Sequence, residues 1–177
     1  MKIAVLSDIH DNIWVLEKVL EGVAGADALI FCGDFCAPFT LAMIAERFRG
    51  PVHCVAGNND GDALLLSQVA GRAGNVTLHG AFAELNLGGR RVFVNHYPPI
   101  AEGVAASGLY DLVCFGHNHQ AEIRRIGRTL LVNPGEVMGR FGHPTYAIYD
   151  AEAGEAFLYE IPRPAHPDWN DKEAPAD

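Results

Sequence analysis

Short apolar segments alternate with amphipathic segments in the first half of this chain. Three segments read as strands buried on both faces: Lys2 to Leu6, Asp27 to Cys32 and Pro51 to Val55. Each is followed by apolar residues at helical spacing: Ile13/Leu16/Leu20, then Leu41/Ile44/Phe48, then a short helix around Ala63 to Val69. This alternation is typical of βαβ units and predicts a parallel sheet.

Hairpin signals replace the helices in the second half. Three pairs of strand-like segments are joined by short turns that contain glycine: 82–87 with 90–95, 123–126 with 129–132, and 146–149 with 156–161. Further strands are predicted at 76–79 and 112–115, and a helix at 100–106. We therefore predict one α/β domain over residues 1–161. Residues 162–177, rich in proline and charge without periodicity, are predicted to form a loose tail.

Polar residues between these segments have two interpretations. Asp11, Asn12 and Asp60 precede predicted helices, so we interpret them as helix caps, with a supporting role beneath a functional site as the alternative. Pro38 suits the first turn of the second helix.

Five polar blocks stand where apolar segments end, and they are the strongest functional signal. They read Ser7-Asp8-Ile9-His10, Gly33-Asp34, Gly57-Asn58-Asn59-Asp60, an isolated His96, and Gly116-His117-Asn118-His119. Side chains at the carboxyl ends of buried strands converge on one crevice in an open α/β sheet. The blocks offer seven oxygen and nitrogen donors, which suit two metal ions that share a bridging carboxylate. These donors are Asp8, His10, Asp34, Asn58, His96, His117 and His119.

The spacing within the blocks supports convergence. Asp8 and His10 are two positions apart, as are His117 and His119, so in an extended segment each pair would face one cavity. The glycines before Asp34, Asn58 and His117 are expected to allow tight turns.

The donor types predict the metal and the chemistry. Carboxylate, amide and imidazole without thiolate favour divalent manganese, iron, zinc, cobalt or nickel over magnesium. Two such ions about 4 Å apart can hold a bridging hydroxide as the nucleophile. No serine or cysteine nucleophile stands in a recognisable setting.

The charge of the chain indicates which classes of partner it can bind. The formal net charge of −9 disfavours duplex nucleic acid and membrane surfaces as partners, whereas a small phosphorylated substrate remains compatible with a site that holds cations.

Cys32, Cys36, Cys54 and Cys114 are interpreted as packing residues. No apolar run approaches membrane-spanning length and no signal peptide is recognised, so we expect a cytoplasmic location.

The ordered blocks resemble the calcineurin-like metallophosphoesterase superfamily, and the short length and Ser7-to-Asn12 segment resemble its small YfcE-type phosphodiesterase branch. The resemblance runs from Met1 to about Tyr159 and includes Asn133-Pro134-Gly135. It implies a four-layer sandwich, two β-sheets covered by helices on both outer faces. It also implies one ion, most readily manganese, at Asp8, His10 and His119, and a second at Asn58, His96 and His117, with Asp34 as the bridge.

Three positions depart from the branch. Asn59 stands where many members carry a histidine that protonates the leaving group, and asparagine cannot supply that proton. His96 lies in Asn95-His96-Tyr97 rather than Thr-His-Gly. Glu136 replaces a serine, which would add negative charge near a bound phosphate.

These residues predict a binuclear phosphoesterase, most readily a phosphodiesterase, in which Asp34, Asn58, His96 and Asn59 surround the reaction. The alternative is a non-catalytic scaffold or regulatory metal-binding protein on the same fold, which Asn59 supports. A nuclease is a third interpretation, against which the compact chain and its charge argue. A homo-oligomer is compatible with the resemblance, although no residue pattern identifies an interface. Taken singly, His96 could be an ordinary histidine and Asp8 or Asp34 a helix cap; the metal interpretation rests on the whole set.

Overall fold

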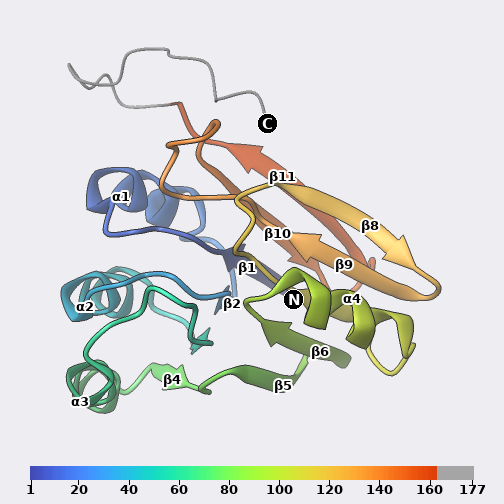
Figure 1. Ribbon diagram of the computed structural model, residues 1–177, viewed down its shortest axis with the longest axis horizontal. Coiled ribbons are helices and arrows are strands. Elements are labelled where there is room, and N and C mark those ends of the chain that lie inside the picture. Colours follow the sequence, from blue (N-terminus) through green and yellow to red (C-terminus); the bar gives the residue numbers. More distant parts are fainter. Residues whose placement is uncertain (163–177) are drawn as a thin grey trace.

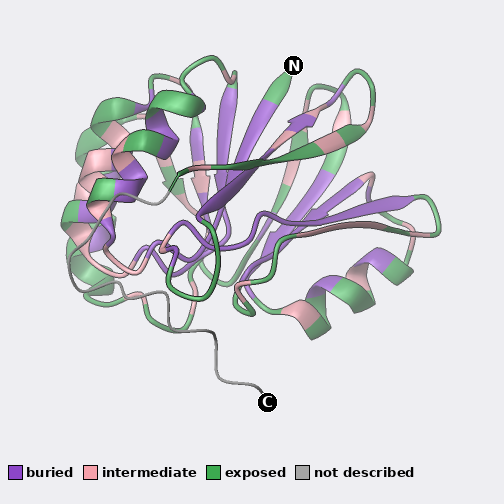
Figure 2. Ribbon diagram, turned by 90° about the horizontal axis from the view of Figure 1, so that it is seen from above, coloured by how far each residue is buried: buried purple, intermediate pink, exposed green. Residues whose placement is uncertain are grey.

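Two β-sheets lie face to face with helices on both outer sides (Figures 1 and 2) in the computed structural model, which describes residues 1–162. The first sheet has six strands in the order β11-β10-β1-β2-β3-β4. Their bounds are β1 (Lys2–Leu6), β2 (Ala28–Phe31), β3 (Val52–Cys54), β4 (Val76–Leu78), β10 (Thr145–Asp150) and β11 (Glu155–Glu160). Strands β1 to β4 run parallel, as their βαβ pattern predicts, and β10 joins β1 antiparallel.

The second sheet has five strands in the order β5-β6-β7-β9-β8. Their bounds are β5 (Phe82–Leu87), β6 (Arg90–Asn95), β7 (Leu112–Cys114), β8 (Glu122–Ile126) and β9 (Thr129–Asn133). The predicted hairpins are β5–β6, β8–β9 and β10–β11. Strands β6, β7 and β9 are parallel to one another, so their carboxyl ends share one edge.

Four helices complete the outer layers of the described residues. Helices α1 (Ile13–Gly22), α2 (Pro38–Arg47) and α3 (Ala63–Ala73) cover the first sheet, and α4 (Pro98–Ala106) covers the second (Figure 1). Helix α3 extends past the predicted end at Val69, and α4 begins at Pro98 because proline is tolerated in the first turn. No helix of this part of the chain has the length and apolar character that a membrane crossing needs.

Strands β1 and β2 of the first sheet are buried on both faces. In β1, Ile3 and Val5 pack between the sheets, where they join Val94 of β6, whereas Ala4 and Leu6 pack against the helices. This two-sided burial explains why the sequence of β1 is continuously apolar rather than alternating. The predicted four-layer α/β sandwich is confirmed.

The helix starts use some predicted caps and not others. Asn12 caps α1, since its side chain accepts a hydrogen bond from Val15 N. Asp11 instead accepts from the backbone of Ala37 and the hydroxyl of Thr40, and so supports the start of α2.

The prediction that Asp60 is a helix cap is wrong, because Asp62 caps α3 through Leu65 N. The Asp60 carboxylate accepts hydrogen bonds from the backbone N–H groups of Asp34, Cys36 and Gly57. This side chain therefore ties together the loops after β2 and β3, directly beneath the polar blocks.

The limits of the domain stay a prediction. The tail predicted at 162–177 lies outside the described residues, apart from Pro162 itself.

Candidate metal centre

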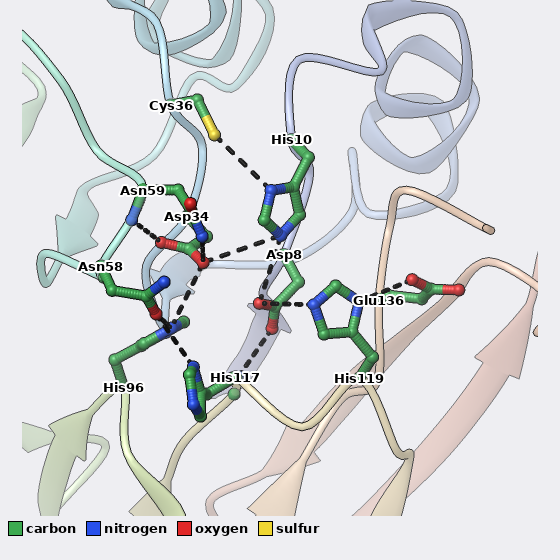
Figure 3. Close-up of polar contacts among 12 residues, drawn as sticks. Asp8, His10, Asp34, Cys36, Asn58, Asn59, His96, His117, His119 and Glu136 are labelled. Carbon is green, nitrogen blue, oxygen red and sulfur yellow. Dashed lines mark hydrogen bonds and ion pairs between the residues drawn. The ribbon is translucent and has the colours of Figure 1, made fainter. Parts of the chain in front are cut away.

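The polar blocks meet where the carboxyl ends of strands from both sheets come together (Figure 3). Asp8, Asp34 and Asn58 follow β1, β2 and β3 of the first sheet. His96 and His117 follow β6 and β7 of the second, and His117 N donates a 3.0 Å hydrogen bond to Asp8 Oδ2 across the two sheets. The structure thus brings all seven predicted donors to one place. Their binding of metal stays a prediction.

The first group of donors consists of Asp8, His10 and His119. Asp8 Oδ1 lies 3.7 Å from His10 Nε2 and 3.5 Å from His119 Nε2. Ligand atoms about 2.1 Å from a shared ion are separated by roughly 3.0–3.6 Å, depending on the coordination geometry. Asp8 Oδ1 and His10 Nε2 are buried without a hydrogen-bond partner among the described residues. A buried polar atom without a partner is costly, and a cation at this position would satisfy both. This group therefore fits a divalent ion.

The second group consists of Asn58, His96 and His117. Asn58 Oδ1 lies 3.1 Å from His96 Nε2 and 2.9 Å from His117 Nδ1, so all three atoms face a common point. One oxygen and two imidazole nitrogens are a donor set that first-row divalent ions accept. The geometry supports the ligand division that the family resemblance implied.

Asp34 lies between the two groups. Its Oδ2 is 3.6 Å from His10 Nε2 on one side and 3.4 Å from His96 Nε2 on the other. Burial of Asp34 opposes its ionisation, but hydrogen bonds from His96 and Asn59 outweigh burial and hold the pKa of the carboxyl well below its usual value. Asp34 is therefore a carboxylate at neutral pH, as a bridging ligand must be.

Hydrogen bonds across the site raise the pKa of His96 and His119. Burial of each ring disfavours its charged form, but the hydrogen bond of His96 with Asp34 and that of His119 with Glu136 outweigh it. In the metal-free protein these rings therefore hold protons more tightly than an ordinary histidine does.

The backbone of the blocks is left-handed rather than extended, which corrects the reasoning from residue spacing. Asp8, His10, Asp34, His117 and His119 all have φ between 44° and 74°. Such values are uncommon for residues other than glycine, and they cluster where function maintains strain. Both members of each pair do face the site, but sharp turns direct them there.

The glycines of the blocks are required by close packing as much as by backbone conformation. Gly33 has φ +101°, but a side chain at Gly57 would collide with the Asp34 carboxylate and one at Gly116 with Ser7 and Asp8. The expectation of tight turns thus holds at Gly33, whereas Gly57 and Gly116 allow two ligand loops to touch.

Three histidines are held by their outer nitrogen, so that the other nitrogen faces the site (Figure 3). His96 Nδ1 lies 2.7 Å from Cys32 O, which requires a proton on Nδ1, so the lone pair of the neutral ring is on Nε2, the atom that a metal would bind. His10 Nδ1 lies 3.7 Å from Cys36 Sγ. His119 Nδ1 lies 2.7 Å from Glu136 Oε2.

Asn59 binds the predicted bridging ligand. Its backbone N and its Nδ2 donate hydrogen bonds of 2.8 and 2.7 Å to the two carboxylate oxygens of Asp34. The side chain thus orients Asp34, and an amide at this position has no acidic proton to give.

Sequence reasoning misjudged or missed several residues around the site. Glu136 is 2% exposed and its carboxylate contacts His119, a contact that sequence reasoning did not foresee, and its expected effect on a bound phosphate stays a prediction. Cys36, predicted only to pack, contacts His10. Exposed rings of Tyr97 and Phe141 lie edge-on to His117 and His119 respectively. Only Glu136 carried a signal in the sequence, as a carboxylate beside the Asn-Pro-Gly turn; the other contacts join segments far apart in the chain.

Comparisons with known proteins identify the family of this chain. Residues 1–154 match the family model described as the calcineurin-like phosphoesterase superfamily domain. Phosphodiesterase MJ0936 of Methanocaldococcus jannaschii is 30% identical over 160 residues, which cover 88% of this chain and 96% of the relative. Phosphodiesterase YfcE of Escherichia coli is 28% identical, with 85% and 88% covered.

Solved structures share the fold. An archaeal phosphodiesterase superposes with a TM-score of 0.85 at 28% identity, covering 91% of this chain and all of that one. Vps29 of Chaetomium thermophilum superposes with a TM-score of 0.68 at 16% identity, covering 96% and 98%, which shows likeness of fold alone. The sequence match, the shared fold and the gathered donors lead to one conclusion: this chain belongs to the calcineurin-like phosphoesterase superfamily and is a hydrolase of phosphate esters.

Proposed function

We propose that this protein is a phosphodiesterase that uses two divalent metal ions. The observation that carries the proposal is the pair of donor groups on either side of Asp34, with Asp8 Oδ1 and His10 Nε2 buried without a hydrogen-bond partner in the described structure. Asp8, His10 and His119 would hold one ion, Asn58, His96 and His117 the other, and Asp34 both. Two ions bound there would supply a bridging hydroxide as nucleophile and polarise the phosphoryl oxygens. Manganese suits this mixed oxygen and nitrogen set well, and iron, zinc, nickel or cobalt are also compatible.

The chain's own residues prepare the site. Asn59 and His96 hold Asp34 ionised and oriented. Cys32 O fixes the ring of His96, so its Nε2 points between Asn58 and Asp34. Because these positions are set before any ligand binds, little reorganisation remains for the reaction, which is the basis of electrostatic catalysis.

A small phosphodiester is the substrate class that we infer. Relatives at 30% and 28% identity are named phosphodiesterases. The formal net charge of −9 opposes a long polyanion, whereas a single phosphate is attracted by ions at the centre. Asn59 offers no acidic proton, which favours esters whose leaving group departs readily as an anion. We further propose that the protein acts in the cytoplasm and tolerates assembly into a homo-oligomer.

Hydrolysis of bis-p-nitrophenyl phosphate tests the proposal. Protein stripped of metal is expected to be inactive, and activity is expected to return with manganese and to reach its maximum at two ions per chain. p-Nitrophenyl phosphate, measured in parallel, separates diesterase from monoesterase activity.

The scaffold alternative predicts a different result. On that interpretation the chain would bind two ions yet turn over neither ester. The comparisons do not favour it, because the phosphodiesterases MJ0936 and YfcE match most of this chain.

A further inference from the structure

Glu136 is the one carboxylate that contacts an outer histidine nitrogen in the described site. Its Oε2 lies 2.7 Å from His119 Nδ1, whereas the outer nitrogens of His96 and His10 face a carbonyl oxygen and a thiol. Among these three histidines, His119 alone has a carboxylate at its outer nitrogen. The contact therefore concerns the donor group of Asp8, His10 and His119.

The second carboxylate oxygen of Glu136 is also engaged. Oε1 accepts hydrogen bonds of 2.6 Å from Phe141 N and 3.0 Å from Gly142 N. Glu136 is 2% exposed, and its ion pair with His119 is the only one recorded for it within residues 1–162. A carboxylate fixed at both oxygens and removed from water cannot swing away, so it determines where the imidazole lies.

The same contacts connect His119 to the rim of the site. The backbone bond at Phe141 places that ring edge-on to His119, with centroids 5.2 Å apart. The Arg140 guanidinium in turn lies over the Phe141 ring. Glu136 thus joins a predicted ligand to the segment that covers it.

We propose that Glu136 is a positioning residue that holds His119 with its proton on Nδ1 and its Nε2 lone pair toward Asp8, and so strengthens ion binding at Asp8, His10 and His119 alone. The inference rests on the proposed function, since it requires that these residues bind an ion. A carboxylate behind an imidazole fixes its tautomer and increases its basicity as a ligand, and loss of such a partner typically lowers metal affinity about 10–100-fold.

Glu136→Gln is the direct test, because glutamine keeps the size of the side chain but has one acceptor oxygen instead of two. Manganese titration by calorimetry is expected to show one of the two sites weakened about 10–100-fold and the other unchanged. Glu155→Gln, on the exposed strand β11, serves as the matched control and should leave both sites as they are. Equal weakening of both sites, or no weakening, would overturn the inference.

A measurement on the unaltered protein covers the case in which Glu136→Gln does not fold. Nitrogen-15 NMR of metal-free protein at about pH 9 reports which nitrogen of a neutral imidazole carries the proton. We expect the Nδ1–H tautomer for His119, and an Nε2–H tautomer would overturn the inference. Wild-type protein that binds none of manganese, iron, zinc, nickel and cobalt would instead refute the proposed function, whereas two bound ions with an unaffected Glu136→Gln variant would refute the role of Glu136 alone.

Discussion

The backbone N–H of His117 donates a 3.0 Å hydrogen bond to the carboxylate of Asp8, a residue 109 positions earlier in the chain. This bond joins the loop after β7 of one sheet to the loop after β1 of the other. It uses Asp8 Oδ2 and leaves Oδ1 buried without a hydrogen-bond partner in the described structure. This hydrogen bond between the loops of the two sheets thus also leaves one predicted ligand atom, Asp8 Oδ1, available to a metal ion.

Replacement of the central carboxylate, Asp34, should strongly reduce turnover. We expect Asp34→Asn to lose at least about a hundredfold in activity on bis-p-nitrophenyl phosphate. Loss of a residue that only hydrogen-bonds to a metal ligand already lowers metal affinity or activity by up to about a hundredfold, and Asp34 is a proposed ligand itself. Bound manganese, measured by elemental analysis, should also fall. Glu155→Gln is the control for a carboxylate removed from the surface. Undiminished turnover by Asp34→Asn would contradict a bridging role.

The dependence of the hydrolysis rate on the leaving group should show that the site lacks a general acid. Since a general acid contributes about a hundredfold or more with poor leaving groups, the wild-type rate should fall steeply along a series from nitrophenyl to unsubstituted phenyl esters. Asn59→His should flatten this series. Asn59→Ala is the matched control, because it removes the same hydrogen bond to Asp34 without adding an acid. A shallow wild-type series would mean that another group donates the proton.

As the pH falls, metal affinity should begin to decrease at a higher pH than it does at sites built from ordinary histidines. The pKa values of His96 and His119 are raised above the ordinary 6.5, because their hydrogen bonds with Asp34 and Glu136 outweigh burial. Protons therefore compete with metal already above pH 6.5. Manganese titrations between about pH 6 and 9 should show affinity falling as the pH is lowered through this range. Affinity that stays constant down to pH 6.5 would contradict the raised values.

The stability of the metal-free protein, unlike its metal affinity, should decrease as the pH rises. The raised pKa values of His96 and His119 stabilise the folded protein below pH 6.5, and this stabilisation is lost as the pH rises through the pKa values of the folded state. The melting temperature of the metal-free protein should therefore fall above pH 6.5. His53 and His79 do not interfere, because burial lowers their pKa values and their effect lies below 6.5. The lowered pKa of Asp34 acts only below 3.8. A melting temperature that rises above pH 6.5 without metal would oppose this account.

The close approach of two ligand loops should make Gly116 intolerant of a side chain. A Cβ at Gly116 would meet Ser7 and Asp8, so Gly116→Ala should lose about 1–3 kcal/mol of unfolding free energy in urea and bind less metal. Gly71, inside α3, has open space around its Cβ direction, and Gly71→Ala should gain up to about 1 kcal/mol. Equal effects of the two changes would mean that the Gly116 contact is not restrictive.

The strand and helix pattern predicted most of the fold, because burial on both faces gives strands such as β1 a continuous apolar sequence. Hairpins were predictable from glycine at their turns, as at Gly88-Gly89 between β5 and β6. Local signals also explain the errors at the ends of elements. The predicted helix ends at Val69, yet α3 continues to Ala73, because the one exposed glycine in between, Gly71, costs only about 1 kcal/mol.

The residues of the candidate centre could be found from the sequence, but the contacts that hold them in place could not. Asp8 and His117 carry the chemistry of ligands at strand ends, which is visible in a single chain. Asp60 and Glu136 were visible as acidic residues in or beside the sequence motifs, but their contacts with Asp34 and His119 span 26 and 17 positions and are not indicated by any local spacing. The left-handed turn at Asp8 is likewise maintained by tertiary contacts against the preference of the residue itself.

Anomalous diffraction from crystals of the manganese-loaded protein tests the central claim most directly. We predict two peaks about 4 Å apart, one among Asp8, His10 and His119 and the other among Asn58, His96 and His117, with Asp34 contacting both. A single peak, or peaks away from these residues, would contradict the account.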